Sequence, residues 1–251
     1  MAESMNVRLE IFPDLQSASE ALAADIVNLV ASALQEREHF TLALSGGSTP
    51  KTLYQILAED YGQELPWEQI HVFWSDERYV PPDSEESNQR MVREALLNRT
   101  PVPPENVHPI QTETMDPMSS SRAYEDELVD FFDDPTPRFD LILLGIGTDG
   151  HTASLFPHSA VLEEKQRLVM PVSADAEPQR RLTFTYPLIN NARHVSFLAA
   201  GVEKAEAVRD VVAGDAEIED RPAAGVSPHD GTLTWWLDQA AARLLRAETP
   251  S

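Results

Sequence analysis

Residues 141–157 read LILLGIGTDGHTASLFP and combine a fold signal with a group of chemically active side chains. The first four are apolar without alternation, which is typical of a strand buried on both faces of a parallel sheet, although a short buried helix gives the same pattern. Gly145 and Gly147 then end the run, so the chain turns where a ligand can approach the backbone. Open α/β folds bind their ligands in such loops, at the carboxyl ends of strands.

Asp149 and His151 follow in the same loop. Because imidazole exchanges protons near neutrality, His151 is a candidate general base. Asp149 either orients that imidazole or only shapes the loop, as aspartate often does. The third glycine of a dinucleotide-binding fingerprint is missing. The loop therefore predicts acid–base chemistry.

Helix-like and strand-like segments alternate along the chain, which indicates an open, mostly parallel, Rossmann-like α/β sheet with helices on both faces. A length of 251 residues with 42% hydrophobic content fits a single domain spanning residues 1–251. Ser17 and Glu20 form a capping box before one helix. Trp235 and Trp236 fall on the last predicted helix, one toward the core and the other toward a partly exposed groove. The predicted strands cover residues 40–44, 70–74, 107–110, 141–144 and 193–199, and further helices cover residues 51–58, 118–132, 202–212 and 233–245.

The composition excludes several classes of function. A formal net charge of −23 disfavours nucleic-acid and membrane partners, which need clustered Lys and Arg. The chain has no cysteine, so thiolate chemistry and Cys-based metal sites are excluded. The first residues do not resemble a secretory signal and no long apolar run occurs, so we expect a cytoplasmic protein. We also expect a monomer, since neither a coiled coil nor a long apolar edge is evident.

Residues 45–50 read SGGSTP between a predicted strand and a predicted helix. Thr49 as N-cap and Pro50 in the first helical position place free backbone N–H groups at the loop, where they attract anions. No lysine follows the second glycine, so this is not a nucleotide-binding P-loop. The alternative is a capped turn that binds nothing. The candidate phosphate ligands are Ser45, Gly46, Gly47, Ser48 and Thr49.

Three stretches together resemble the 6-phosphogluconolactonase family: LALSGGSTP at 42–50, FWSDERYVPPDSEESNQRM at 73–91 and the 141–157 loop. The resemblance continues through residues 181–208 and 222–242, so it covers nearly the whole chain. It departs from the family within the last stretch, where a run of small residues lacks the serine often found there.

The related glucosamine-6-phosphate isomerase/deaminase group shares single motifs with this chain. After His151, however, those deaminases continue with an apolar residue and Asn-Glu-Pro, whereas residues 152–157 here read TASLFP. Residues 76–78 read DER, where the deaminases carry Asp-Glu-Tyr. Both differences favour the lactonase branch.

The resemblance implies hydrolysis of 6-phospho-D-glucono-1,5-lactone to 6-phosphogluconate in the oxidative pentose phosphate pathway, without metal or cofactor. His151 is then the base that activates water, Asp149 its partner, and Gly147 a substrate contact. Backbone N–H groups of the 145–150 loop are candidates for stabilising the oxyanion.

The resemblance also implies cations that hold the phosphate. Arg78 and Lys204 match family positions, although an ion pair with a neighbouring carboxylate and an exposed surface charge are their respective alternatives. Arg181 matches a third position, but Arg180 beside it means that one of the two can simply face solvent. Asn88 either bonds a sugar hydroxyl or caps a helix.

Two other functions are compatible with parts of the sequence. A sugar-phosphate isomerase or deaminase would shuttle protons with His151, but it lacks its loop glutamate here. A non-catalytic sugar-phosphate-binding module of a transcriptional regulator would need a DNA-binding segment, and no basic helix-turn-helix precedes residue 40. The other six histidines show no metal-ligand spacing and are expected at the surface or at strand ends.

Overall fold

The computed structural model describes residues 6–174, 180–214 and 216–245; residues 1–5, part of the stretch examined for a secretory signal, lie outside it. Its larger sheet has the strand order β1-β10-β9-β6-β2-β3-β5, and all neighbouring strands are parallel. This confirms the predicted parallel α/β architecture. The strands are β1 (Asn6–Phe12), β2 (Phe40–Leu44), β3 (Ile70–Trp74), β5 (Val107–His108), β6 (Leu141–Leu144), β9 (His194–Ala199) and β10 (Thr232–Asp238).

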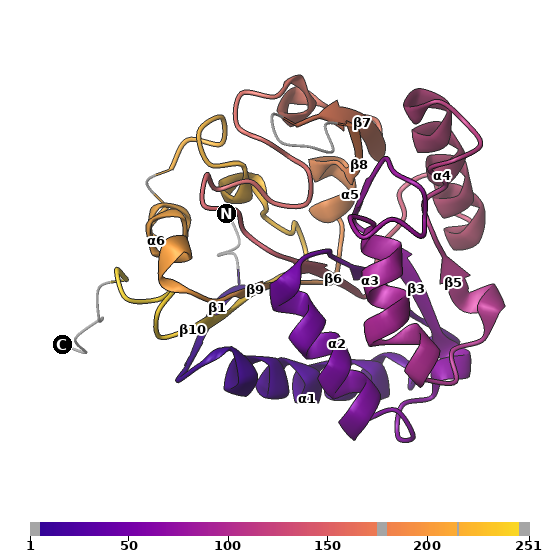
Figure 1. Ribbon diagram of the computed structural model, residues 1–251, viewed down its shortest axis with the longest axis horizontal. Helices are drawn as coiled ribbons and strands as arrows, with labels where there is room; N and C mark the ends of the chain where they lie inside the picture. The colour runs from indigo at the N-terminus through magenta and orange to yellow at the C-terminus, as the bar shows by residue number, and fades with distance from the viewer. Residues whose placement is uncertain (1–5, 175–179, 215, 246–251) are drawn as a thin grey trace.

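Helices cover both faces of this sheet, as predicted. In Figure 1, α1 and α2 lie below the sheet, and α5 and α6 lie above it. All side chains of β2 and β6 are buried, which explains why β6 is apolar without alternation and β2 is apolar apart from Thr41. The helices are α1 (Leu15–Ala33), α2 (Ser48–Asp60), α3 (Asn88–Ala95), α4 (Pro117–Phe132), α5 (Tyr186–Ile189) and α6 (Ala205–Val212).

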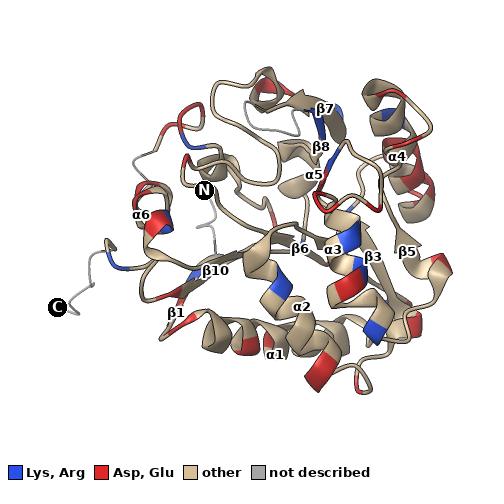
Figure 2. Cartoon of the chain, in the orientation of Figure 1, with Lys and Arg blue, Asp and Glu red and all other residues tan. Residues whose placement is uncertain are grey.

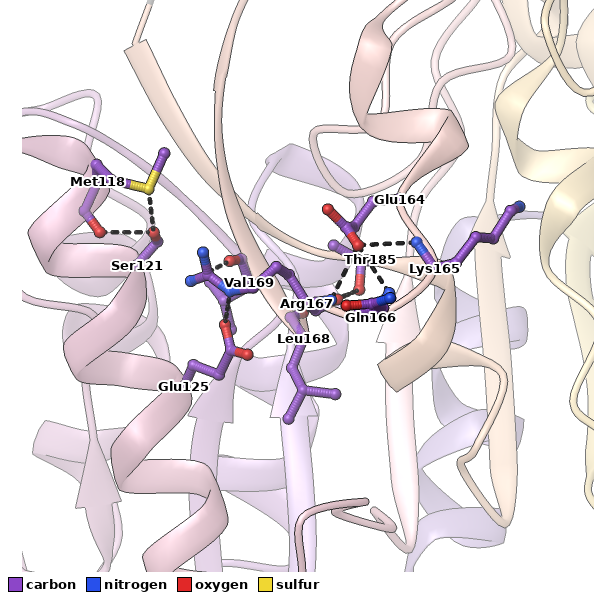
Figure 3. A network of polar contacts seen from close by, with 10 residues as sticks. All are labelled: Met118, Ser121, Glu125, Glu164, Lys165, Gln166, Arg167, Leu168, Val169 and Thr185. Carbon is purple, nitrogen blue, oxygen red and sulfur yellow. Dashed lines mark hydrogen bonds and ion pairs between the residues drawn. The ribbon is translucent and has the colours of Figure 1, made fainter.

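A second, three-stranded antiparallel sheet was not expected from the sequence. It contains β4 (Asp76–Arg78), β8 (Arg180–Phe184) and β7 (Val169–Ser173). Just before β7, Arg167 Nε donates to Glu125 Oε2 of α4 at 2.6 Å, and Glu164 accepts three backbone N–H groups (Figure 3). The Arg167–Glu125 bond ties the segment before β7 to α4, while the Glu164 bonds hold residues 164–167 in a turn.

The predicted helix over residues 233–245 is wrong, because most of its first half forms strand β10. This strand pairs with β1 on one edge and β9 on the other, and its side chains from Leu233 to Asp238 are buried. Trp235 stacks on Phe197 at 4.1 Å between ring centroids, and Trp236 stacks on Phe12 at 6.0 Å. Both tryptophans are buried, so neither faces a groove.

The predicted capping box at the start of α1 is also wrong. The N-cap is Asp14, whose carboxylate accepts the Ser17 backbone N–H at 2.8 Å, while Glu20 accepts from Gln16. The preceding strand, β1, was missed, and it forms one edge of the large sheet.

Charge is spread widely over the outer surface. Figure 2 shows acidic residues along α1 and α4, with basic residues interspersed on α2 and α3. Within the described ranges, no helix is both long and apolar enough to cross a membrane.

Candidate functional site

The loop after β6 brings Asp149 against His151. Asp149 Oδ1 lies 2.6 Å from His151 Nδ1 and also accepts the His151 backbone N–H at 3.1 Å. Burial raises the pKa of Asp149, but hydrogen bonds and charge from His151 outweigh it and hold that pKa at about 2. The ionised carboxylate favours a proton on Nδ1 and leaves the lone pair on Nε2. This geometry supports the orienting role for Asp149.

Glycine at position 147 makes room for the imidazole, since a Cβ there would collide with His151 Nδ1. The loop closes on itself: Gly147 N–H donates to His151 O at 2.8 Å, and Gly150 N–H donates to Gly147 O at 3.1 Å. These two N–H groups are therefore occupied and are not oxyanion donors. The side chain of His151 is 34% exposed, so water and substrate can reach it.

The turn between β2 and α2 supplies a helix N-terminus. Helix α2 begins at Ser48, and its N-cap Gly47 has φ 110°, a left-handed value that favours glycine. The predicted start, with Thr49 as N-cap and Pro50 next, is wrong by two residues, because Gly47 lets the helix begin earlier. The site remains suited to an anion, since the N–H groups and positive dipole end of a 13-residue helix point toward it.

Two arginines lie opposite each other in the small sheet. Arg78 of β4 and Arg181 of β8 are register partners, and like charges directly opposite are destabilising. Burial lowers the pKa of Arg181, and the charge of Arg78 lowers it further. Arg180, by contrast, is exposed, as strand alternation requires. A bound anion would relieve the repulsion between Arg78 and Arg181.

A buried polar network positions Arg78. Its Nη1 donates to Asn88 Oδ1, and Asn88 Nδ2 donates to the backbone oxygen of Asp76 at 2.9 Å. Asp76 Oδ2 accepts from Ser154 Oγ at 2.7 Å, which ties β4 to the segment that follows His151. In the described part of the chain, Arg78 forms no ion pair with either neighbouring carboxylate. The roles of Asp76 and Ser154 in this network were not predicted from the sequence.

Glu77 caps helix α3. Its carboxylate accepts the backbone N–H groups of Arg78, Asn88 and Gln89 at 2.7 to 2.8 Å, while Ser87 is the N-cap residue. Asn88 is therefore the first residue of α3 and not its cap. Burial raises the pKa of Glu77 to about 7, although the three donors lower it.

The turn before α2, the two arginines of the small sheet and His151 line one cavity of about 310 Å³ at the carboxyl ends of β2, β6 and β9. Lys204 enters it from the short 3₁₀ turn (Val202–Lys204) before α6. Asp149 is not part of the lining and reaches the cavity through His151. The predicted site residues that line it are Ser45, Gly46, Gly47, Ser48, Thr49, Arg78, Asn88, Gly147, His151, Arg181 and Lys204.

Nearly the whole chain is similar to proteins named 6-phosphogluconolactonase. A 6-phosphogluconolactonase from Synechocystis sp. is 46% identical over 96% of this chain and 100% of the relative, and one from Nostoc sp. is 44% identical over 94% and 98%. The solved structure of 6-phosphogluconolactonase from Trypanosoma brucei superposes with a TM-score of 0.85 at 31% identity, over 97% of this chain and 100% of that one. The family model described as glucosamine-6-phosphate isomerases/6-phosphogluconolactonase matches residues 13–235. The chain belongs to this family.

This family member contains a brace that sequence reasoning missed. Arg221 Nη1 donates to the Asp149 backbone oxygen at 3.1 Å, and its Nε and Nη2 each lie 3.1 Å from Asp210 Oδ2 on α6. Lys204 immediately precedes the same helix. Arg221 thus connects the loop that carries His151 to the helix that follows Lys204. Arg221 and Asp149 are 72 positions apart in the sequence, so no local motif reveals this contact.

A histidine cluster was also not predicted. His71 Nδ1 lies 3.0 Å from His108 Nε2, and His108 Nδ1 lies 2.9 Å from Glu127 Oε1. Burial lowers the pKa of His71 to about 4, with a smaller contribution from His108. The cluster is not part of the cavity lining, so His151 is the histidine that the site offers.

Proposed function

We propose that this chain hydrolyses 6-phospho-D-glucono-1,5-lactone to 6-phosphogluconate in the cytoplasm. The observation that carries the proposal is the cavity itself, which combines an oriented imidazole with three cations and a helix N-terminus. Full-length similarity to proteins named 6-phosphogluconolactonase supports the same substrate.

The cationic side of the cavity fits the phosphate. Arg78 and Arg181 can grip its oxygens with paired hydrogen bonds, and Lys204 adds a point charge. The N-terminus of α2 supplies backbone donors. Binding the phosphate there fixes the lactone ring within the same cavity as His151.

The chemistry needs one base, because a δ-lactone is an activated ester. Neutral His151 takes a proton from water at Nε2, and the hydroxide attacks the ring carbonyl carbon to form a tetrahedral oxyanion. The bond between that carbon and the ring oxygen then breaks, and the imidazolium returns the proton to the departing oxygen. Asp149 stabilises the imidazolium and holds the imidazole ring of His151 in place.

Acid release from freshly made lactone, followed in a pH-stat and corrected for spontaneous opening, tests the proposal. We expect rapid acid release and no ammonia from glucosamine 6-phosphate. Ammonia release without lactone opening would instead support the isomerase/deaminase function.

A further inference from the structure

Strand β1 presents an apolar stripe at the edge of the large sheet. Within the described residues it pairs with β10 and with no second strand. Val7, Leu9 and Ile11 share one face and are 44%, 42% and 47% exposed, respectively. Arg8 and Glu10 point to the other face and are also exposed.

Edge strands are usually protected from pairing by charged side chains, above all lysines, or by prolines and bulges. Between residues 7 and 11, which read VRLEI, β1 has no lysine, proline or bulge, and its charged side chains are Arg8 and Glu10. Its two charges have opposite sign and flank Leu9 symmetrically. The pattern therefore does not repel a second copy of itself, and it is complementary to one.

Antiparallel pairing centred on Leu9 satisfies every position of this pattern. Val7 then faces Ile11 of the partner subunit, and Arg8 faces Glu10 of the partner subunit, in both directions. A slip of one residue would place apolar side chains opposite charged ones. A shift of the centre to Arg8 or Glu10 would place like charges opposite each other.

We propose that two copies of this chain associate through β1, with a two-fold axis at Leu9, and join their seven-stranded sheets into one. The contact is closed, since each copy uses the same edge that it offers. The opposite edge, β5, has two residues and offers little to pair with. This departs from the monomer expected from the sequence, which assumed that no long apolar edge exists.

Charge repulsion and a small buried area both weaken this dimer, so we expect its formation to depend on protein concentration. Each copy carries a net charge of −23, so the copies repel at a distance. At about 0.15 M salt that repulsion is screened beyond about 8 Å, whereas contacts across paired strands are shorter. A single strand pair also buries less surface than a permanent dimer interface does.

Charge reversal tests the register directly, by sedimentation velocity over a hundredfold range of concentration. Arg8→Glu and Glu10→Arg should each abolish the wild-type dimer, because each places like charges opposite one another. The double swap Arg8→Glu/Glu10→Arg should restore it. An equimolar mixture of the two single variants should dimerise, since opposite charges then face each other at both pairs.

Arg8 and Glu10 both act on Asp25 of α1: burial raises the pKa of that carboxyl, the charge of Arg8 lowers it and the charge of Glu10 raises it. Arg8→Glu therefore replaces a favourable charge near Asp25 with an unfavourable one, whereas Glu10→Arg does the opposite and remains informative if the first variant unfolds. Arg93→Glu, on the distant helix α3, is the control that should leave the dimer unchanged. A wild-type protein that is monomeric throughout, or a dimer unaffected by both single reversals, would overturn the proposal.

Discussion

Asp149 and His151 divide one task between two side chains. The carboxylate of Asp149 accepts a hydrogen bond from Nδ1–H of His151, so the neutral imidazole has its lone pair on Nε2. We expect Asp149→Asn to lower kcat about 10²-fold or more with a small change in KM, because an amide does not hold that tautomer or stabilise the imidazolium. Steady-state kinetics on fresh lactone would measure this. A kcat within about threefold of wild type would leave Asp149 with only a loop-shaping role.

Arg180 and Arg181 form a natural matched pair. Arg181 lines the cavity, whereas its neighbour faces solvent. Arg181→Ala should raise KM about tenfold or more, because a charge-assisted contact to phosphate is lost, and Arg180→Ala should leave KM unchanged. The unphosphorylated lactone serves as the control substrate, since its hydrolysis should respond equally little to both changes. Equal KM values for the two variants would remove Arg181 from the phosphate site.

Among the structural elements, Arg221 couples α6 to the loop that carries Asp149 and His151. Arg221→Met removes two contacts to Asp210 and one to the Asp149 backbone while keeping much of the side-chain volume. We expect kcat to fall about tenfold, since a small misplacement of a catalytic base is costly. Arg93→Met breaks a more exposed ion pair, with Asp83, outside the cavity lining and is the control.

Two further readouts separate positioning from general destabilisation. Arg221→Met should change the pH profile of kcat, because it disturbs the carboxylate that supports His151. Arg221→Lys should recover part of the activity. A variant with lowered thermal stability but wild-type kcat would assign Arg221 a structural role only.

The cap of α3 predicts a dependence of stability on pH. The pKa of Glu77 is about 7 in the folded chain and lies near the ordinary glutamate value of 4.5 when the chain is unfolded, so the folded state holds this proton more tightly. Its contribution to stability is full below about pH 4.5 and is lost as the pH rises to about 7. Relative to wild type, Glu77→Gln should lack this decline. Thermal unfolding midpoints of both proteins, measured between pH 4.5 and 7, test this. If the two midpoints change with pH in the same way, the assignment to Glu77 is wrong.

The sequence predicted the elements whose signal is local. β6 is an unbroken apolar run, β2 and β3 are apolar apart from Thr41 and His71, and the glycine loops after β2 and β6 point to the correct edge of the sheet. β10 was misread because Leu233, Trp236 and Leu237 also fit a helical spacing, and only the pairing with β1 and β9 decides otherwise.

Within the site, too, only the residues that stand in local motifs could be predicted from the sequence. His151 and Arg78 stand in recognisable motifs, but the opposition of Arg78 and Arg181 depends on a strand pairing across about a hundred residues of chain. The bond from Ser154 to Asp76 also joins distant segments, 78 residues apart. Such contacts arise from packing, which no short motif records.

At the scale of the whole molecule, a strongly acidic chain concentrates cations in one place. A net charge of −23 disfavours an anionic substrate at long range, so the attraction must act at short range. Arg78, Arg181 and Lys204 come from separate parts of the chain and converge on the cavity that holds His151. The parallel topology makes this possible, because it brings the loops after β2, β6 and β9 to a single edge.

The most direct measurement is the rate of lactone opening by His151→Ala in a pH-stat, corrected for spontaneous hydrolysis and accompanied by circular dichroism. We predict a fall to near the spontaneous rate, at least 10²-fold below wild type, with the fold retained. Wild-type turnover by a folded His151→Ala protein would contradict the account.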